Sequence, residues 1–214
     1  MTVANGINLS SYQHLVLHDV SWEFYEQLLR EVGDRHIQIT YDDGSLEIMS
    51  PLPEHERWGA WIARLIELMC LERSIDCECL GSTTFRDAAK RKGLEPDECY
   101  YFINAARARE MEEQFDPDVD PVPELALEID ITNRSVAREP IYAALGVPEI
   151  WRFNGSALQV RQLSSRRKYM VRSRSRTFPF LPLAEFSTFV LRMSERNQLR
   201  VLREFRTWVT SLPE

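Results

Sequence analysis

Two short stretches of the chain hold acidic residues that could act together in metal-dependent chemistry. Asp97 follows Pro96 at the start of an apolar, aromatic run that is typical of a strand. Glu128 and Asp130 lie on one face of a second predicted strand, residues 123–131, whose other face is apolar. If the two strands are neighbours, the three carboxylates converge. Clustered carboxylates without matching lysines favour a hard cation, Mg²⁺ or Mn²⁺.

The alternation of apolar residues with acidic residues in segment 123–131 has a second interpretation. Antiparallel sheets often pack one face on the core and leave the other in water, so the acidic face could simply be hydrated. The two interpretations differ in the expected burial of Glu128. A strand that is covered on both faces must pair its carboxylates with protein groups or with an ion.

Several short sequence motifs follow one another between about residues 35 and 162. They are Leu46–Pro51, Glu54–Arg57, Gly93–Tyr101, Glu128–Thr132 and Ile141–Trp151. In this order they resemble the putative restriction endonuclease family that is expanded in cyanobacteria, within the PD-(D/E)XK nuclease superfamily. The resemblance implies an α/β fold with a restriction endonuclease-like core, in which a mixed sheet is flanked by helices. An N-terminal helix and hairpin and C-terminal helices would complete it.

The resemblance also implies a function and a set of site residues. The function is hydrolysis of phosphodiester bonds in DNA with Mg²⁺ or Mn²⁺, for which the metal ligands would be Asp97, Glu128 and Asp130. The superfamily usually has a lysine two residues after the glutamate, where this chain has Asp130. The basic residue expected on the next helix corresponds to Arg138. An arginine can neutralise charge in the transition state but, because it stays protonated, cannot act as a general base.

Arg138 and the net charge of −7 leave two other functions open. One is a catalytically silent member of the same fold that binds nucleic acid or a protein. The other is a metal-dependent hydrolase of a small phosphate ester. The salt dependence of binding separates a duplex from a small substrate, because only a duplex releases many counterions.

One segment of this acidic chain is strongly basic. Residues 161–176 contain seven basic residues and no acidic residue. The segment is compatible with a hydrated hairpin and with a surface that contacts phosphates. If the protein binds DNA, the expected contacts are Arg161, Arg166, Arg167, Lys168, Arg172, Arg174 and Arg176.

A predicted helix must bring further groups to the acidic residues. Apolar residues recur at helical spacing over residues 54–73, and the apolar face, extended back by one turn, reaches His55. We therefore expect His55 in the same cleft as Asp97, with His55 or Glu56 as general base if the reaction needs one. The alternative for His55 is a histidine at the edge of the core that bonds a backbone group.

The remaining patterns predict the elements that surround this site. They are a helix at 22–32, a hairpin at 37–48, a strand at 76–86, a charged turn at 88–93, a strand at 96–103, a helix that ends near 145, and C-terminal helices within 180–211. The C-terminal helices are expected to cover the core or the surface of a homodimer. Residues 1–12 are expected to be loose.

Length and composition indicate one nuclease-like domain over residues 1–214. The chain is long enough to bury a core, and 44% hydrophobic and 28% charged residues are usual for a globular protein. No apolar run approaches the roughly 20 residues of a membrane span, and no secretion signal is evident, so we expect a cytoplasmic protein. The four cysteines form no C-x-x-C pair, which argues against a zinc site.

Overall fold

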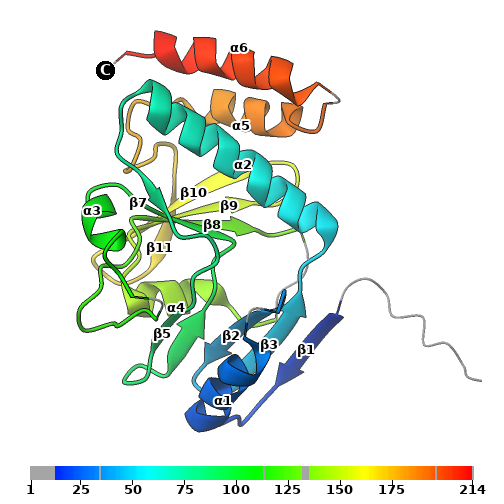
Figure 1. The fold of residues 1–214 in the computed structure, drawn as a ribbon, viewed down its shortest axis with the longest axis vertical. Helices are drawn as coiled ribbons and strands as arrows, with labels where there is room; N and C mark the ends of the chain where they lie inside the picture. Colours follow the sequence, from blue (N-terminus) through cyan, green and yellow to red (C-terminus); the bar gives the residue numbers. More distant parts are fainter. Residues whose placement is uncertain (1–12, 34, 113, 132–134, 196, 214) are drawn as a thin grey trace, which may run out of the picture.

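The computed structural model describes residues 13–33, 35–112, 114–131, 135–195 and 197–213; residues 1–12, which were expected to be loose, lie outside this part. The described chain forms two sheets with helices on their faces (Figure 1). The predicted mixed α/β fold with flanking helices is therefore confirmed. The helices are α1 (Trp22–Val32), α2 (Pro53–Glu72), α3 (Ala105–Ala108), α4 (Arg138–Leu145), α5 (Leu183–Arg192) and α6 (Gln198–Ser211).

The first sheet is antiparallel and comes mainly from the N-terminal third of the chain. Its strand order is β1 (Gln13–Leu17), β3 (Ser45–Ser50), β2 (Gln38–Asp42), β6 (Lys92–Leu94) and β5 (Phe85–Asp87). The predicted hairpin is the β2–β3 pair, whose turn residues Asp43 and Gly44 have φ of 42° and 99°. Helix α1 packs on this sheet through Tyr25, whose ring stacks on Tyr41 at 4.9 Å between centroids.

Helix α1 and strand β6 approach so closely that only glycine fits at position 93. A Cβ atom there would overlap the buried side chain of Tyr25, with ring carbon Cε1 only 2.8 Å away. We expect Gly93→Ala to destabilise the protein by about 1–3 kcal/mol, because the stacked ring has no free space to move into. Urea unfolding measures this loss. Gly59→Ala in α2 is the matched control, since its nearest atom would be Ile129 Cγ1 at 3.8 Å; an equal loss in both variants would contradict the prediction.

The second sheet is mixed and carries the acidic strands. Its strand order is β11 (Tyr169–Arg172), β10 (Leu158–Leu163), β9 (Glu149–Phe153), β8 (Leu125–Ile129), β7 (Glu98–Tyr101) and β4 (Glu78–Cys79). Strands β8 and β9 run parallel, and the other neighbours run antiparallel. Helix α4 makes the crossover between β8 and β9, which a parallel pair requires.

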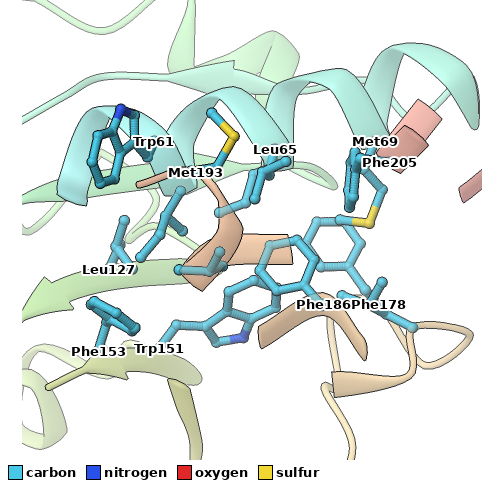
Figure 2. Packing of buried hydrophobic residues seen from close by; sticks show 14 of the residues in the cluster. Trp61, Leu65, Met69, Leu127, Trp151, Phe153, Phe178, Phe186, Met193 and Phe205 are labelled. Carbon is cyan, nitrogen blue, oxygen red and sulfur yellow. The ribbon is translucent and has the colours of Figure 1, made fainter. Parts of the chain in front are cut away.

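Helices cover both faces of strand β8. Figure 2 shows Trp61 and Leu65 of α2 over Leu127 on one face, where the larger core lies. On the opposite face, Ile141 of α4 packs in a cluster with Ala126. All five residues of β8 are buried, and Glu128 is only 4% exposed. The acidic face is therefore not hydrated, and the half-exposed interpretation of the alternation is wrong.

The C-terminal helices cover the core, as one of the two sequence interpretations expected. Phe186 of α5 and Phe205 of α6 are fully buried in the same cluster as α2 (Figures 1 and 2). Within the described ranges, no helix combines the length and apolar character that a membrane span requires.

The segment between α2 and the first acidic stretch differs from the prediction. Instead of one strand at 76–86, the chain forms β4 in the second sheet and β5 in the first. It crosses between the sheets near Gly81, whose φ of 57° is left-handed. The predicted turn at 88–93 ends in β6, which pairs with β5 and β2. The sequence pattern missed these short strands because each has only three residues or fewer.

Candidate active site

Asp97 and Glu128 lie on neighbouring segments of the second sheet, as the sequence predicted. The antiparallel register pairs Glu98 with Leu127, so Asp97 lies directly before β7, next to the end of β8 that carries Glu128. The Asp97 amide donates to the Leu127 carbonyl oxygen at 3.1 Å. Both acidic side chains are buried, at 4% and 5% exposure. The two buried acids therefore lie at the same end of the β7–β8 pair, and their joint role in one site stays a prediction.

Three donors from different elements surround the Asp97 carboxylate. Gln38 Nε2 of β2 donates to Oδ1 at 2.6 Å, and the Ile129 amide of β8 donates to Oδ2 at 2.5 Å. His55 Nε2 of α2 lies 3.3 Å from the same Oδ2. The predicted place of His55 in the Asp97 cleft is thus confirmed. Together these contacts fix the carboxylate in one orientation.

Glu128 contacts two residues of helix α4. The Tyr142 hydroxyl donates to Glu128 Oε1, and Arg138 Nη2 lies 3.1 Å from the same oxygen. Arg138 is the first residue of α4, where the sequence placed it, and Nη2 also donates to the carbonyl oxygen of Glu95. Burial alone would lower the pKa of Arg138, but the Glu128 and Asp97 carboxylates raise it above its usual value. The guanidinium is therefore a permanent positive charge in contact with Glu128.

Asp130 belongs to a different group of charges. Arg152 of β9 donates to Asp130, and its Nη1 lies 2.8 Å from Glu139 Oε1. Among the residues that the structure describes, no group of three or more acidic, histidine or cysteine side chains has the geometry of a metal site. The three carboxylates predicted as ligands therefore do not form one such group. The role of Asp97 and Glu128 as ligands of a shared ion stays a prediction.

Glu56 contacts two histidines, one of which also contacts Asp97. Its Oε1 lies 3.5 Å from His55 Nδ1 and 3.6 Å from His36 Nε2, and its side chain is 46% exposed. His55 therefore stands between Glu56 and Asp97. This arrangement lets Glu56 influence Asp97 through the imidazole, but it is not a direct contact between the two acids.

Two cavities flank the acidic pair. The first, of about 750 Å³, includes Asp97, Gln38 and Glu56. The second, of about 780 Å³, lies against α4 and includes Glu128 and Arg138. Asp97 therefore lines one cavity and Glu128 the other.

Sequence reasoning missed three residues of the site. Tyr142 lies four residues after Arg138, and this helical spacing could have placed both on one face of α4. Gln38 gave no comparable signal, because it reaches Asp97 from the other sheet. Glu95 lines the first cavity, where Thr84 Oγ1 donates to it at 2.9 Å and burial raises the pKa of its carboxyl to about 6.

The donors of the acidic pair fit a small divalent cation. Mg²⁺ is usually held by one or two carboxylates, with water and substrate phosphate completing its octahedron. Asp97 and Glu128 supply two carboxylates from neighbouring segments of the sheet, and each of them lines a cavity. A third protein carboxylate is not required for such an ion.

The fold and the paired acids define a restriction endonuclease-like α/β protein. The chain belongs to the Uma2 family, described as putative restriction endonuclease, whose model matches residues 22–191. A solved structure of a putative nuclease belonging to DUF820, from Anabaena variabilis, has a similar fold with a TM-score of 0.50 at 12% identity. The match covers 89% of this chain and 99% of that one. No curated protein matches the sequence.

These comparisons confirm the family and the fold that the sequence predicted. Family membership supports a nuclease function in general and the use of a divalent metal ion. The roles of the individual residues, the identity of the ion and the nucleic acid that is cut stay predictions.

Proposed function

We propose that this protein is an endonuclease that cleaves DNA with the help of Mg²⁺ or Mn²⁺. The observation that carries the proposal is the burial of Asp97 and Glu128 on neighbouring segments of the sheet with Arg138 in contact with Glu128. Buried acids cost free energy unless positive charge offsets them. A metal ion that arrives with the substrate would add to the charge that Arg138 supplies.

Each residue of the site then has a defined task. Asp97 and Glu128 would hold the ion, which would polarise the scissile phosphate and activate a water molecule. Arg138 would offset negative charge that develops on the phosphate, and it cannot accept a proton. His55 keeps Asp97 oriented from α2, and either His55 or Glu56 is the candidate general base.

The basic segment offers contacts for the DNA backbone. Arg166, Arg172, Arg174 and Arg176 are exposed, whereas Arg161 is paired with Glu139 at 2.6 Å. Exposed arginines suit phosphate contacts because they need not break an ion pair first. This supports binding of DNA through the predicted segment, with Arg161 in a structural position.

A second candidate is a catalytically silent protein of the same fold that binds nucleic acid. The contact of 3.1 Å between Arg138 and Glu128 favours it, because a fixed guanidinium already offsets one of the two acids. The two candidates make the same prediction for DNA binding and opposite predictions for cleavage.

Incubation of a supercoiled plasmid with the protein separates them. We expect nicking or linearisation with Mg²⁺ or Mn²⁺ and none with EDTA, and binding that weakens linearly on logarithmic axes as salt rises. Salt-dependent binding without cleavage under either ion would favour the silent protein. Neither binding nor cleavage of DNA or RNA would overturn both candidates.

Removal of the Tyr142 hydroxyl tests how Glu128 is held. We expect Tyr142→Phe to lower metal-dependent cleavage by about 10- to 100-fold, the usual effect of losing a group that orients a metal ligand. The metal concentration for half-maximal cleavage should rise as well. Tyr41→Phe is the matched control, because its hydroxyl bonds the Val20 carbonyl oxygen at 2.8 Å in the first sheet. Equal activities of the two variants would show that the Tyr142 hydroxyl does not position Glu128.

A further inference from the structure

The second cavity has the size and the lining of a ligand site. Its volume of about 780 Å³ lies within the usual range of small-molecule pockets. One part of its wall is apolar and comes from Val136, Pro140, Ala143, Ile150 and Tyr169. The other part is charged. A ligand that fits both parts must combine a flat or apolar body with an ionic group.

The charges of the cavity leave an excess of positive charge. Its three carboxylates are each paired with arginine: Glu128 with Arg138, Asp130 with Arg152, and Glu139 with Arg152 and Arg161. The lining also includes Arg167 and Lys168, which are exposed and have no carboxylate partner in the described part of the chain. The ionic group of the ligand is therefore an anion.

Arg138 gives an independent indication of a missing acceptor. The residue is 7% exposed, and its Nε and Nη1 are buried without a hydrogen-bond partner among the described residues. Each buried donor without a partner costs roughly 1–3 kcal/mol. A phosphate oxygen beside the guanidinium would remove that cost, and arginine is well suited to phosphate.

We propose that this cavity binds one nucleotide unit of a nucleic acid strand, with Arg138 facing its phosphate and Lys168 and Arg167 at the exposed rim. The apolar wall around Tyr169 and Ile150 receives the nucleoside. This inference rests on the proposed function and deepens it, because it places the nucleic acid strand in the cavity beside α4 and Glu128. It also selects Arg167 and Lys168, two of the seven basic residues in segment 161–176, as direct contacts.

Titration with inorganic phosphate and with thymidine 5′-monophosphate tests the proposal in metal-free protein. We expect the Nε–H resonance of Arg138 in a ¹H–¹⁵N spectrum to shift with either probe, with tighter binding of the nucleotide. Comparison with Arg138→Lys assigns the resonance. Lys168→Ala should weaken binding of both probes by about three- to tenfold, as for loss of one exposed charged contact.

Arg203→Ala is the matched control, because Arg203 is an exposed cation of α6 that does not line the cavity. An unmoved Arg138 resonance, or equal weakening by the two alanine variants, would overturn the proposal. Equal affinities for phosphate and nucleotide would contradict the proposal that the apolar wall binds the nucleoside. The titration does not depend on cleavage, so the two proposals can fail separately. A protein that cuts DNA but does not bind the probes in this cavity refutes the nucleotide site alone. A protein that binds the probes but does not cut DNA refutes the nuclease proposal alone.

Discussion

Replacement of Asp97 by asparagine is expected to lower the DNA cleavage rate by about a thousandfold without loss of the fold. A metal ion contributes several kcal/mol to stabilisation of the transition state, and about 1.4 kcal/mol corresponds to a factor of ten in rate. Asparagine has the shape of aspartate but lacks the charge that holds the ion. Its oxygen can still accept from the Ile129 amide, and a flipped Gln38 amide can accept from its nitrogen.

Single-turnover cleavage of a labelled duplex, with urea unfolding of the same samples, measures both parts of this expectation. Asp43→Asn is the control, since Asp43 is exposed in the β2–β3 turn and pairs with Arg91 at 2.7 Å, far along the chain from the acidic pair. Cleavage by Asp97→Asn within about threefold of the wild type would remove Asp97 from the catalytic site. A large loss of stability in this variant would instead assign Asp97 a structural role.

The sequence predicted the acidic pair because two local signals agreed. The alternation around Glu128 fixed one face of β8, and Asp97 stood at the start of a second strand. The family resemblance indicated Arg138, and Pro140, which is tolerated only in the first turn of a helix, placed it near the start of that helix. These signals depend on a few neighbouring residues, so they can be recognised in the sequence without knowledge of the tertiary structure.

Contacts that depend on strand order could not be predicted in the same way. Asp130 was expected to join the other acids because alternation places it on the same face as Glu128. In the structure, β9 lies parallel to β8 and brings Arg152 into the ion pair with Asp130. Gln38 reaches Asp97 from a strand 59 residues earlier in the chain. Alternation gives the face of a residue but not the neighbour that a different strand places against it.

The buried pair of Arg138 and Glu128 leads to the largest expected effect on stability. We expect Arg138→Met to lower the free energy of unfolding by about 3–5 kcal/mol, because it leaves the Glu128 charge buried without its partner. Methionine retains most of the apolar stem, so the loss of packing volume is small. Arg152→Met is the control: its partners Asp130 and Glu139 are 23% and 29% exposed, and each such pair contributes about 1 kcal/mol or less.

A double variant separates the charge from the packing. Arg138→Met combined with Glu128→Gln removes both charges and retains an acceptor for the Tyr142 hydroxyl, so it should be more stable than Arg138→Met alone. Arg138→Lys should retain cleavage, because a positive charge remains beside Glu128, whereas Arg138→Met should cleave slowly even under conditions in which it is folded. If the double variant is as unstable as Arg138→Met, packing rather than charge explains the loss. If Arg138→Met is unstable but cuts DNA at the wild-type rate, Arg138 supports the fold of the site and takes no part in its chemistry.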